Sequence, residues 1–341
     1  MASKLVRISG SRHQVGLALG NLARPIMSVY LEQSSTWHAL RPWRGHPYLQ
    51  ELSAYVQLST PSLWEELQGM AEGLHMPFED VFLWNCRGDL LHRTNDGCTS
   101  IALYGADGTK WIAHNEDGDP YLFNRCYLVD VQPDNAPGYV SFYYPGSLPG
   151  HTFAANRAGL VQTINNVRAH ARGTGVPRMV VARAVLDCTT LEQAVSLLRD
   201  TPRAGAFHHT LGSPASQDII SVEAIPGMCS ATSVTHRYGH ANHLIHAAMS
   251  DMSQIITGSS QSRQHRIEQL LDHWDVTQDD EQQIVQALHD AQDALPIFRT
   301  EADDPDEENT LATAVFCIHG PSVQLRIYDR NRKISQDLTL V

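Results

Sequence analysis

The 341-residue sequence lacks the motifs that assign many enzymes to a class at first reading. It contains no GxSxG, no P-loop and no GxGxxG leading into a helix, so serine-hydrolase, NTPase and dinucleotide-binding functions find no support. Its six cysteines show no CxxC spacing and the N-terminal stretch has no apolar run of signal-peptide length, so we expect a cytoplasmic chain with reduced cysteines. No stretch is apolar for long enough to span a bilayer.

Positive charge is also scarce. The chain has 25 Lys and Arg residues and 37 Asp and Glu residues, which gives a net charge of −12 with the histidines neutral. That balance argues against binding to nucleic acid or to an anionic membrane surface, and the 18 histidines offset it only when acid pH protonates them. The chain shows no repeat, linker or clear boundary, so we treat residues 1–341 as a single domain.

Apolar periodicity divides the chain into helical and strand segments. Residues 1 to about 92 have the period of amphipathic helices, and Pro25 is expected to kink or divide the first one. From residue 98 the pattern alternates, and an Asp-Gly turn predicts a hairpin of 98–104 with 110–114. Later strands are expected at 125–132, 139–144, 152–155, 160–164, 206–211, 219–225, 231–235, 311–318 and 323–328, with helices at 177–187, 191–199, 263–273 and 278–291. This order indicates two sheets with helices outside, and the acidic stretch 301–308 is expected to be a solvated loop.

The period changes at Asp96-Gly97-Cys98-Thr99-Ser100, where a thiol follows a glycine. Attack of the Cys98 sulfur on the Gly97 carbonyl would cut the bond between them through a thioester, and Gly97 places no side chain in the way. The α-amine released on Cys98, with an ordinary pKa of about 7.7–8.0, could then serve as the base for its own thiol. On these residues alone, a small buried cysteine at the start of a strand is the competing interpretation.

The sequence resembles the N-terminal-nucleophile hydrolases of the acyl-coenzyme A:6-aminopenicillanic acid acyltransferase family. The motifs that carry the resemblance are spread over nearly the whole chain. They are Glu66-Leu67-Gln68-Gly69-Met70-Ala71-Glu72-Gly73, Asp96-Gly97-Cys98-Thr99, Asn115-x-Asp117, Asn156-x-Ala158-Gly159-Leu160, Gly175-Val176-Pro177, Asn242-His243 and Ser262-Arg263-Gln264-His265-Arg266.

The resemblance implies both a fold and a processing event. The fold would be of the α+β class, a four-layer αββα sandwich of two antiparallel sheets flanked by helices. The precursor would cut itself between Gly97 and Cys98, and the α fragment 1–97 would stay bound to the β fragment 98–341 as a heterodimer. The mature protein would act on small N-acyl amides through an acyl-Cys98 thioester, and no cofactor or metal is expected.

The resemblance also assigns roles to individual residues. Cys98 is the expected nucleophile, Asp117 the carboxylate that holds the α-amine and thiol in register, and Asn242 the donor to the oxyanion. A hairpin-end aspartate and a loop-capping asparagine are the structural alternatives for Asp117 and Asn242. The candidate pocket residues are His114, Asn115, Asn165, Phe207, His208 and Arg263.

Two departures from the family pattern stand out. His114 occupies the position where bile-salt hydrolases and acid ceramidase carry an arginine. The acyltransferase has an arginine shortly before a late Thr-Leu pair, and here the stretch Asp306-Glu307-Glu308-Asn309 before Thr310-Leu311 is acidic. This second departure puts the acyl-donor preference in doubt.

Three other functions compete with amide hydrolysis. An acyltransferase would differ only in the group that attacks the thioester, and we favour hydrolysis because the sequence shows no second preorganised site for an amine. A catalytic metal at His240, His243 and His246 or at His208-His209 lacks the HExxH pattern and a paired carboxylate. A non-catalytic binding protein on the same fold, and assembly into a homo-oligomer, are left open by the sequence.

Overall fold

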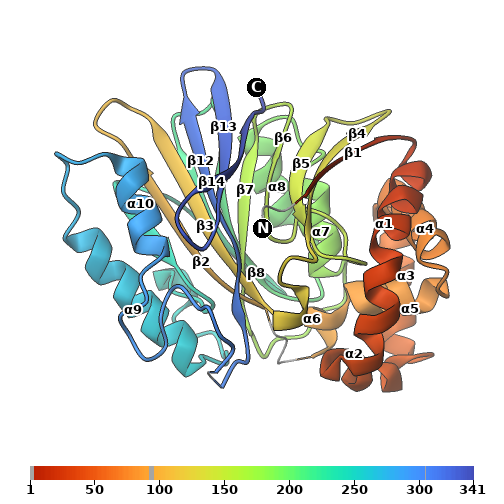
Figure 1. Cartoon of the computed structure of the whole chain (residues 1–341). Helices are drawn as coiled ribbons and strands as arrows, with labels where there is room; N and C mark the ends of the chain where they lie inside the picture. Colours follow the sequence, from red (N-terminus) through yellow and green to blue (C-terminus); the bar gives the residue numbers. More distant parts are fainter. Residues whose placement is uncertain (1–3, 92–95, 304) are drawn as a thin grey trace.

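The computed structural model describes residues 4–91, 96–303 and 305–341, and two β-sheets packed face to face form its centre (Figure 1). Among these residues the larger sheet has eight strands in the order β1 (Lys4–Gly10), β4 (Tyr127–Pro133), β5 (Tyr139–Tyr143), β6 (Phe153–Asn156), β7 (Val161–Asn166), β8 (Phe207–Gly212), β9 (Ile219–Ile225) and β10 (Met228–Ser233). The smaller sheet has the order β11 (Arg237–His240), β2 (Asp96–Tyr104), β3 (Lys110–Gly118), β12 (Asn309–His319), β13 (Ser322–Tyr328) and β14 (Ile334–Thr339).

Helices cover the outer faces of both sheets. Helix α9 (Gly258–Asp272) packs on β11 and β2, and α10 (Asp280–Leu288) packs on β3 and β12. On the larger sheet, α8 (Leu191–Asp200) packs on β9 and β10 and continues the layer begun by α7 (Arg178–Val185). Strands β2 and β3 face β7 and β8 across the interface between the sheets. The predicted αββα sandwich is therefore confirmed.

One strand pair departs from the predicted antiparallel sheets. Strand β1 runs parallel to β4, with Lys4 opposite Tyr127, whereas the other paired strands in the described residues are antiparallel. Strand β1 was also absent from the sequence prediction, which treated the whole N-terminal region as helical. It is a half-exposed edge strand, so its hydrophobic alternation is weak.

The N-terminal helices form a block beside the end of the sandwich (Figure 1). They are α1 (Arg12–Gln33), α2 (Ser35–Leu40), α3 (Pro47–Ser59), α4 (Pro61–Leu74), α5 (Phe78–Asn85) and α6 (Arg87–Leu90). Helix α1 runs through Pro25 without the predicted division, because Pro25 lies on the exposed face where water can take the carbonyl left unpaired. Its other face meets α4 at glycines, and a Cβ on Gly16 would lie 1.9 Å from the Glu66 carbonyl oxygen. The two backbones therefore pack in direct contact.

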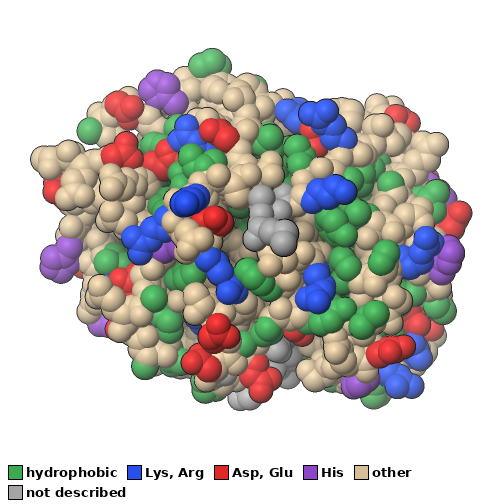
Figure 2. Space-filling model, viewed as in Figure 1, with side chains coloured by type: hydrophobic (Ala, Val, Ile, Leu, Met, Phe, Trp, Pro, Cys, Tyr) green, Lys and Arg blue, Asp and Glu red, His purple; other side chains and the backbone are tan. Residues whose placement is uncertain are grey.

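The surface carries both signs of charge. On the face shown in Figure 2, basic side chains gather towards the middle, with acidic and apolar side chains among them, although the net charge of the chain is −12. None of the helices in the described part of the chain is both long and apolar enough to cross a membrane.

Candidate active site

Cys98 lies in β2, buried between the two sheets. Its side chain is 3% exposed, and the β2–β3 register places it opposite Glu116, with Gly97 opposite Asp117. Strand β7 of the larger sheet packs against β2 across the interface between the two sheets. Burial and the Glu116 carboxylate raise the pKa of the Cys98 thiol well above its usual value, although hydrogen bonds from the Asn166 backbone and the Asn242 side chain oppose this shift. The thiol is therefore protonated in the intact chain.

Asn242 contacts both the backbone nitrogen and the sulfur of Cys98. The Cys98 backbone N–H donates to Asn242 Oδ1 at 2.9 Å, and Asn242 Nδ2 lies 3.6 Å from the Cys98 sulfur. Nδ2 also donates to the Asn166 carbonyl at 3.0 Å. This amide follows β11 and is fully buried, so its position is fixed by the fold rather than by solvent.

Arg263, from helix α9, orients this amide. Its guanidinium donates to Asn242 Oδ1 at 2.6 Å, to Thr99 Oγ1 at 3.0 Å and to the Cys98 carbonyl. Because a guanidinium only donates, the atom it meets on Asn242 must be the oxygen, which leaves the NH₂ group for the sulfur. Arg263 is completely buried, so its guanidinium contacts this site and is not on the surface of α9.

Asp117 belongs to a charged cluster next to the Gly97–Cys98 bond. Its Oδ2 pairs with Arg299 Nη2 at 2.9 Å, and its Oδ1 accepts from Thr310 Oγ1 at 2.6 Å. Burial alone would raise the pKa of Asp117, but Arg299, Arg263 and the Thr310 hydrogen bond hold it below its usual range. Asp117 is therefore a fixed carboxylate. Its contacts with Arg299 and Thr310 extend beyond those of an aspartate that only satisfies a turn.

Glu308 completes that cluster and is the exception in the acidic stretch 301–308, whose other described residues are exposed or partly exposed, as expected. It is fully buried, pairs with Arg299 at 2.8 Å and lies 3.6 Å from Arg168. Burial raises the pKa of Glu308 to about 7, although Arg299 and Arg168 act to lower it. A Cβ on Gly97 would lie 2.1 Å from Glu308 Oε2, so glycine at this position leaves room for the carboxylate.

A second polar cluster lies on the sulfur side of Cys98. The ligating atoms of Cys98, His114 and Glu116 are all within 4.8 Å of one another, and all three side chains are buried. His114 Nε2 is 2.9 Å from Glu116 Oε2, and the Tyr144 hydroxyl donates to Glu116 Oε1 at 2.7 Å. Burial lowers the pKa of His114 to about 3, although Asp117 acts to raise it. The structure thus places His114 beside Cys98, and its role as a pocket residue stays a prediction.

The cluster continues into the larger sheet through Ser100 and Asn165. Ser100 Oγ is 2.9 Å from His114 Nδ1 and donates to Asn165 Oδ1 at 2.8 Å. His208 Nδ1 meets the same oxygen at 2.9 Å, and Asn165 Nδ2 donates to the His240 carbonyl at 3.1 Å. Asn165 and His208 therefore hold Ser100 in position, and Ser100 in turn contacts His114.

The other two pocket candidates lie away from the thiol. The Asn115 amide donates to the Leu288 carbonyl and accepts from Thr313 Oγ1 at 2.7 Å, which ties β3 to α10 and β12. Phe207 packs under the Arg178 guanidinium, 4.3 Å from the ring centre. Asn115 is on the opposite face of β3 from His114 and Glu116, because successive side chains of a strand alternate.

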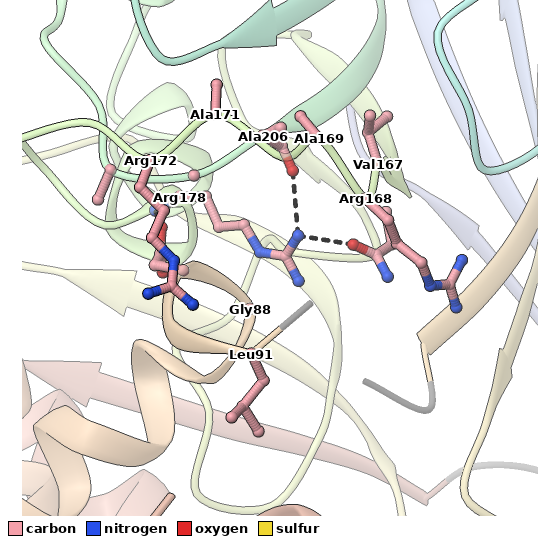
Figure 3. A pocket seen from close by; sticks show the side chains of 13 residues that line it. Gly88, Leu91, Val167, Arg168, Ala169, Ala171, Arg172, Arg178 and Ala206 are labelled. Atoms are coloured by element: carbon pink, nitrogen blue, oxygen red, sulfur yellow. Dashed lines mark hydrogen bonds between the residues drawn. The ribbon is translucent and has the colours of Figure 1, made fainter. Parts of the chain in front are cut away.

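A small cavity of about 20 Å³ adjoins the site through Asn166. Arg178 extends across it and donates to Asn166 Oδ1 at 2.6 Å and to the Ala206 carbonyl at 3.1 Å (Figure 3). Arg168, Arg172 and Asp89 also line it. A Cβ on Gly88 would lie 1.7 Å from Arg178 Nη2, so Gly88 makes room for the guanidinium.

Cys98, His114 and Glu116 are also residue types that bind metal ions. Their arrangement favours hydrogen bonding instead, since His114 Nε2 and Glu116 Oε2 already face one another at 2.9 Å. The histidines considered as metal ligands in the sequence each have hydrogen-bond partners in the fold. His240 meets Glu223 at 3.1 Å, His243 meets Ser260 at 2.8 Å and His246 meets Ser221 at 2.8 Å. That the protein needs no metal or cofactor stays a prediction.

Sequence reasoning missed Glu116, Arg299 and Glu308. Glu116 had a usable signal, because alternation within the predicted hairpin places it on the same face as His114 and opposite Cys98. Arg299 had none. It approaches Asp117 from the loop before β12, where the Thr310 backbone N–H donates to its carbonyl at 2.8 Å, and thereby brings an arginine beside Thr310 although the residues just before it are acidic.

The αββα sandwich with this cysteine on an inner strand has the architecture of an N-terminal-nucleophile hydrolase. The family model of the acyl-coenzyme A:6-aminopenicillanic acid acyl-transferase matches residues 104–332, more than half of the chain, and the chain belongs to this family. The matched segment includes Asp117, Asn242 and Arg263 and begins after Cys98.

Curated relatives carry two different activities in their names. The beta-alanyl-dopamine/carcinine hydrolase of Drosophila melanogaster is 26% identical over 222 residues, which cover 56% of this chain and 56% of that protein. The 40 kDa form of the acyl-coenzyme A:6-aminopenicillanic-acid-acyltransferase of Emericella nidulans is 25% identical over 246 residues, 68% of this chain and 66% of that protein. The chain thus spans less than two thirds of the length of either relative.

Among solved structures, the C2A mutant of the conjugated bile acid hydrolase from Clostridium perfringens matches with a TM-score of 0.46 and 11% identity. The match covers 71% of this chain and 96% of that one.

Proposed function

We propose that the protein is a self-processing cysteine amidohydrolase that cleaves small N-acyl amides through an acyl-Cys98 thioester. The observation that carries this proposal is the position of Asn242, whose oxygen holds the Cys98 nitrogen at 2.9 Å while its NH₂ group lies 3.6 Å from the sulfur. One side chain thereby fixes the future amine and the nucleophile together. Membership of the acyltransferase family supports the same chemistry.

Processing would convert the backbone nitrogen of Cys98 into the base of the mature enzyme. The cut gives fragments 1–97 and 98–341, and the new α-amine stays beside Asn242 Oδ1, which already accepts from it as an amide. Asp117, held as a carboxylate opposite Gly97, would then hold the ammonium form of the amine. We propose that the two fragments act together as a heterodimer in the cytoplasm.

Turnover would use the donors already placed around the sulfur. The carbonyl carbon of the substrate is attacked by Cys98, and charge develops on its oxygen as the tetrahedral intermediate forms. Asn242 Nδ2 and the Asn166 backbone N–H both point at the sulfur, so they are the donors closest to that oxygen. The α-amine passes the thiol proton to the leaving amine, and water then releases the acyl group.

The cavity beside Asn166 bears on the substrate class. Its volume of about 20 Å³ holds little more than one water molecule, so the cavity contributes charge beside the site rather than space for an acyl group. Arg168, Arg172 and Arg178 outnumber Asp89 among its described lining residues. We therefore expect acyl groups that end in a carboxylate to be preferred over ω-amino acyl groups such as the β-alanyl group in the name of the Drosophila relative.

Self-processing is tested by the mass of the purified protein. The wild type should give two fragments that divide between Gly97 and Cys98 on a denaturing gel and by intact mass, and Cys98→Ala should give one full-length chain. Cys317→Ala, a partly buried cysteine in β12, is the matched control and should process normally. A wild type that stays uncleaved under all conditions would contradict the proposal and favour the non-catalytic alternative.

Hydrolysis is tested on processed enzyme with a panel of N-acyl amines followed by mass spectrometry. The panel should pair succinyl and β-alanyl amides of the same amine, with release of free acid as the expected result. A second arm supplies acyl-coenzyme A and amine acceptors. Turnover that depends strictly on an added amine would overturn hydrolysis in favour of acyl transfer.

A further inference from the structure

The base proposed for the mature enzyme, the α-amine of Cys98, does not exist before the Gly97–Cys98 bond is cut. In the intact chain the Cys98 nitrogen is an amide whose N–H donates to Asn242, so it has no lone pair available to accept the thiol proton. Burial also keeps the thiol protonated. Another group must therefore move protons when the Gly97–Cys98 bond is broken.

His114 and Glu116 are the groups placed for that task. Both are buried, and His114 Nε2, Glu116 Oε2 and the Cys98 sulfur lie within 4.8 Å of one another, a span that one water or a small side-chain rotation bridges. Asp117 is a poor alternative, because Arg299 and Thr310 occupy its two oxygens and hold its pKa low. Arg263 has no basic atom to offer.

The hydrogen-bond directions around His114 locate a proton. Asn165 Oδ1 can only accept, so the Ser100 hydroxyl, 2.8 Å away, must donate its single hydrogen to it. The contact of 2.9 Å between Ser100 Oγ and His114 Nδ1 then requires that Nδ1 carries a hydrogen. His114 Nε2 and Glu116 Oε2 meet at 2.9 Å, and one of these two atoms must also carry a hydrogen.

His114 and Glu116 therefore share one proton, either as imidazole with carboxylic acid or as imidazolium with carboxylate. Burial lowers the pKa of His114 to about 3, because the charged imidazolium loses its hydration. The Tyr144 hydroxyl donates to the other Glu116 oxygen and leaves Oε2 directed at the histidine. In either form the pair is neutral overall and can accept one proton while it releases another.

We propose that the His114–Glu116 pair transfers the proton during self-cleavage of the Gly97–Cys98 bond. The Cys98 sulfur forms a bond to the Gly97 carbonyl carbon, and its thiol proton passes to the pair. The bond from that carbon to the Cys98 nitrogen breaks, its electrons go to the nitrogen, and the pair returns one proton there. The product is a Gly97 thioester on the Cys98 sulfur with a free α-amine, and water then hydrolyses the thioester. This step rests on the proposed self-processing.

The titratable groups that face the pair come from five strands or their flanking loops. They are Cys98 from β2, Asp117 from β3, Cys126 before β4, Tyr144 after β5 and His208 from β8. Each is buried among the described residues, so the pair exchanges protons within a closed site.

The experiment compares self-cleavage in the full-length chain. Glu116→Gln keeps a donor for His114 Nε2 and removes the acid, so cleavage should slow by about 100-fold or more. Glu116→Asp keeps a carboxylic acid and should regain part of the rate. Glu281→Gln makes the same exchange at a partly buried glutamate of α10 that accepts from the Tyr328 hydroxyl of β13 at 2.6 Å, and it should cleave like the wild type. Urea unfolding of each variant shows that it is folded.

Hydroxylamine identifies the step that is affected, because it cleaves thioesters without a catalyst. Glu116→Gln precursor that stays intact in hydroxylamine has not formed the thioester, as the proposal requires. Cleavage restored by hydroxylamine would show that the pair acts only on thioester hydrolysis, and would overturn the proposal. Folded Glu116→Gln that cleaves at the wild-type rate would overturn it too. Self-processing itself fails only if the wild type does not cleave.

Discussion

At the scale of single residues, the site depends on which way one amide is turned. Asn242 can hold the Cys98 nitrogen with its oxygen and face the sulfur with its NH₂ group only in one orientation. Arg263 enforces that orientation by donating to the oxygen at 2.6 Å from a fully buried position. Preorganisation of this kind is the largest contribution that a fixed donor makes to catalysis.

Replacing Asn242 by aspartate tests the donor. Asn242→Asp keeps an oxygen for Arg263 and for the Cys98 nitrogen but removes the NH₂ group and adds negative charge beside the thiolate. We expect kcat/KM of processed enzyme to fall by about 100- to 1,000-fold. Steady-state kinetics on the best amide of the panel measures this, with urea unfolding as the control for folding. Unchanged kcat/KM would remove Asn242 from the oxyanion site.

Gly97 is predicted to tolerate no side chain. In Gly97→Ala the new methyl would lie 2.1 Å from Glu308 Oε2 and 2.8 Å from Arg299, so the buried ion cluster must shift. We expect a lower urea midpoint and slower self-cleavage. Gly258→Ala is the matched control, because its Cβ would meet only Leu295 at 3.4 Å. Equal cleavage rates in the two variants would contradict this account of Gly97.

At the scale of elements, a buried ion network joins the two fragments that processing would create. Glu66 of α4 pairs with Arg183 of α7 through both oxygens, at 2.9 and 3.0 Å, and Arg12 of α1 lies 3.3 Å from the same carboxylate. Asp187 bonds both arginines, at 2.8 and 3.0 Å. Glu66 and Arg183 are completely buried, so the network explains why fragments 1–97 and 98–341 should stay together after a cut.

Removing one partner of that network should be costly. Glu66→Gln removes the buried carboxylate of Arg183 and leaves it only the partly exposed Asp187, and breaking a buried pair in this way costs about 3–5 kcal/mol in the free energy of unfolding. Asp130→Asn breaks a surface pair with Arg157, and such pairs contribute about 0–1 kcal/mol. Urea unfolding measures both, and size-exclusion chromatography of processed Glu66→Gln reports whether the fragments separate. Equal losses in the two variants would contradict the role of the network.

At the scale of the whole molecule, burial of many histidines sets the response to acid. Burial lowers the pKa of His114 and His209 to about 3 and that of His243 to about 4, and it also lowers the pKa of His208 and His246. These side chains stay neutral in the folded protein at pH values where the unfolded chain would protonate them. Below about pH 6.5 these histidines therefore bind fewer protons in the folded protein than in the unfolded chain.

Stability should fall as the solution is acidified. The contribution of these histidines is complete above their unfolded pKa of about 6.5 and is lost as the pH falls from there towards 4. Glu308 acts in the opposite direction, because its raised pKa of about 7 favours folding as the pH falls through 7. The histidines outnumber it, so we expect the urea midpoint to be lower at pH 5.0 than at pH 7.5. An equal or higher midpoint at pH 5.0 would contradict this balance.

Sequence reasoning reached the inner hairpin and much of the site. The 98–104 and 110–114 strands were found because Asp107-Gly108 forms a turn in which Gly108 takes a φ of 84°, a conformation that favours glycine. Cys98, Asn242 and Arg263, named from the family motifs, do meet in space. Strands β11 and β14 were missed because they carry too few buried residues to show an alternating pattern.

The sequence by itself determined the layers of this protein, because periodicity and turn residues act over a few neighbouring positions, and its family motifs singled out Cys98 as the proposed nucleophile. Only the tertiary structure decided what surrounds Cys98. Asn242 lies 144 positions away in the chain and Arg299 lies 182 positions from Asp117. Buried charges and amides need partners wherever the fold supplies them, and that requirement leaves no local pattern in the sequence.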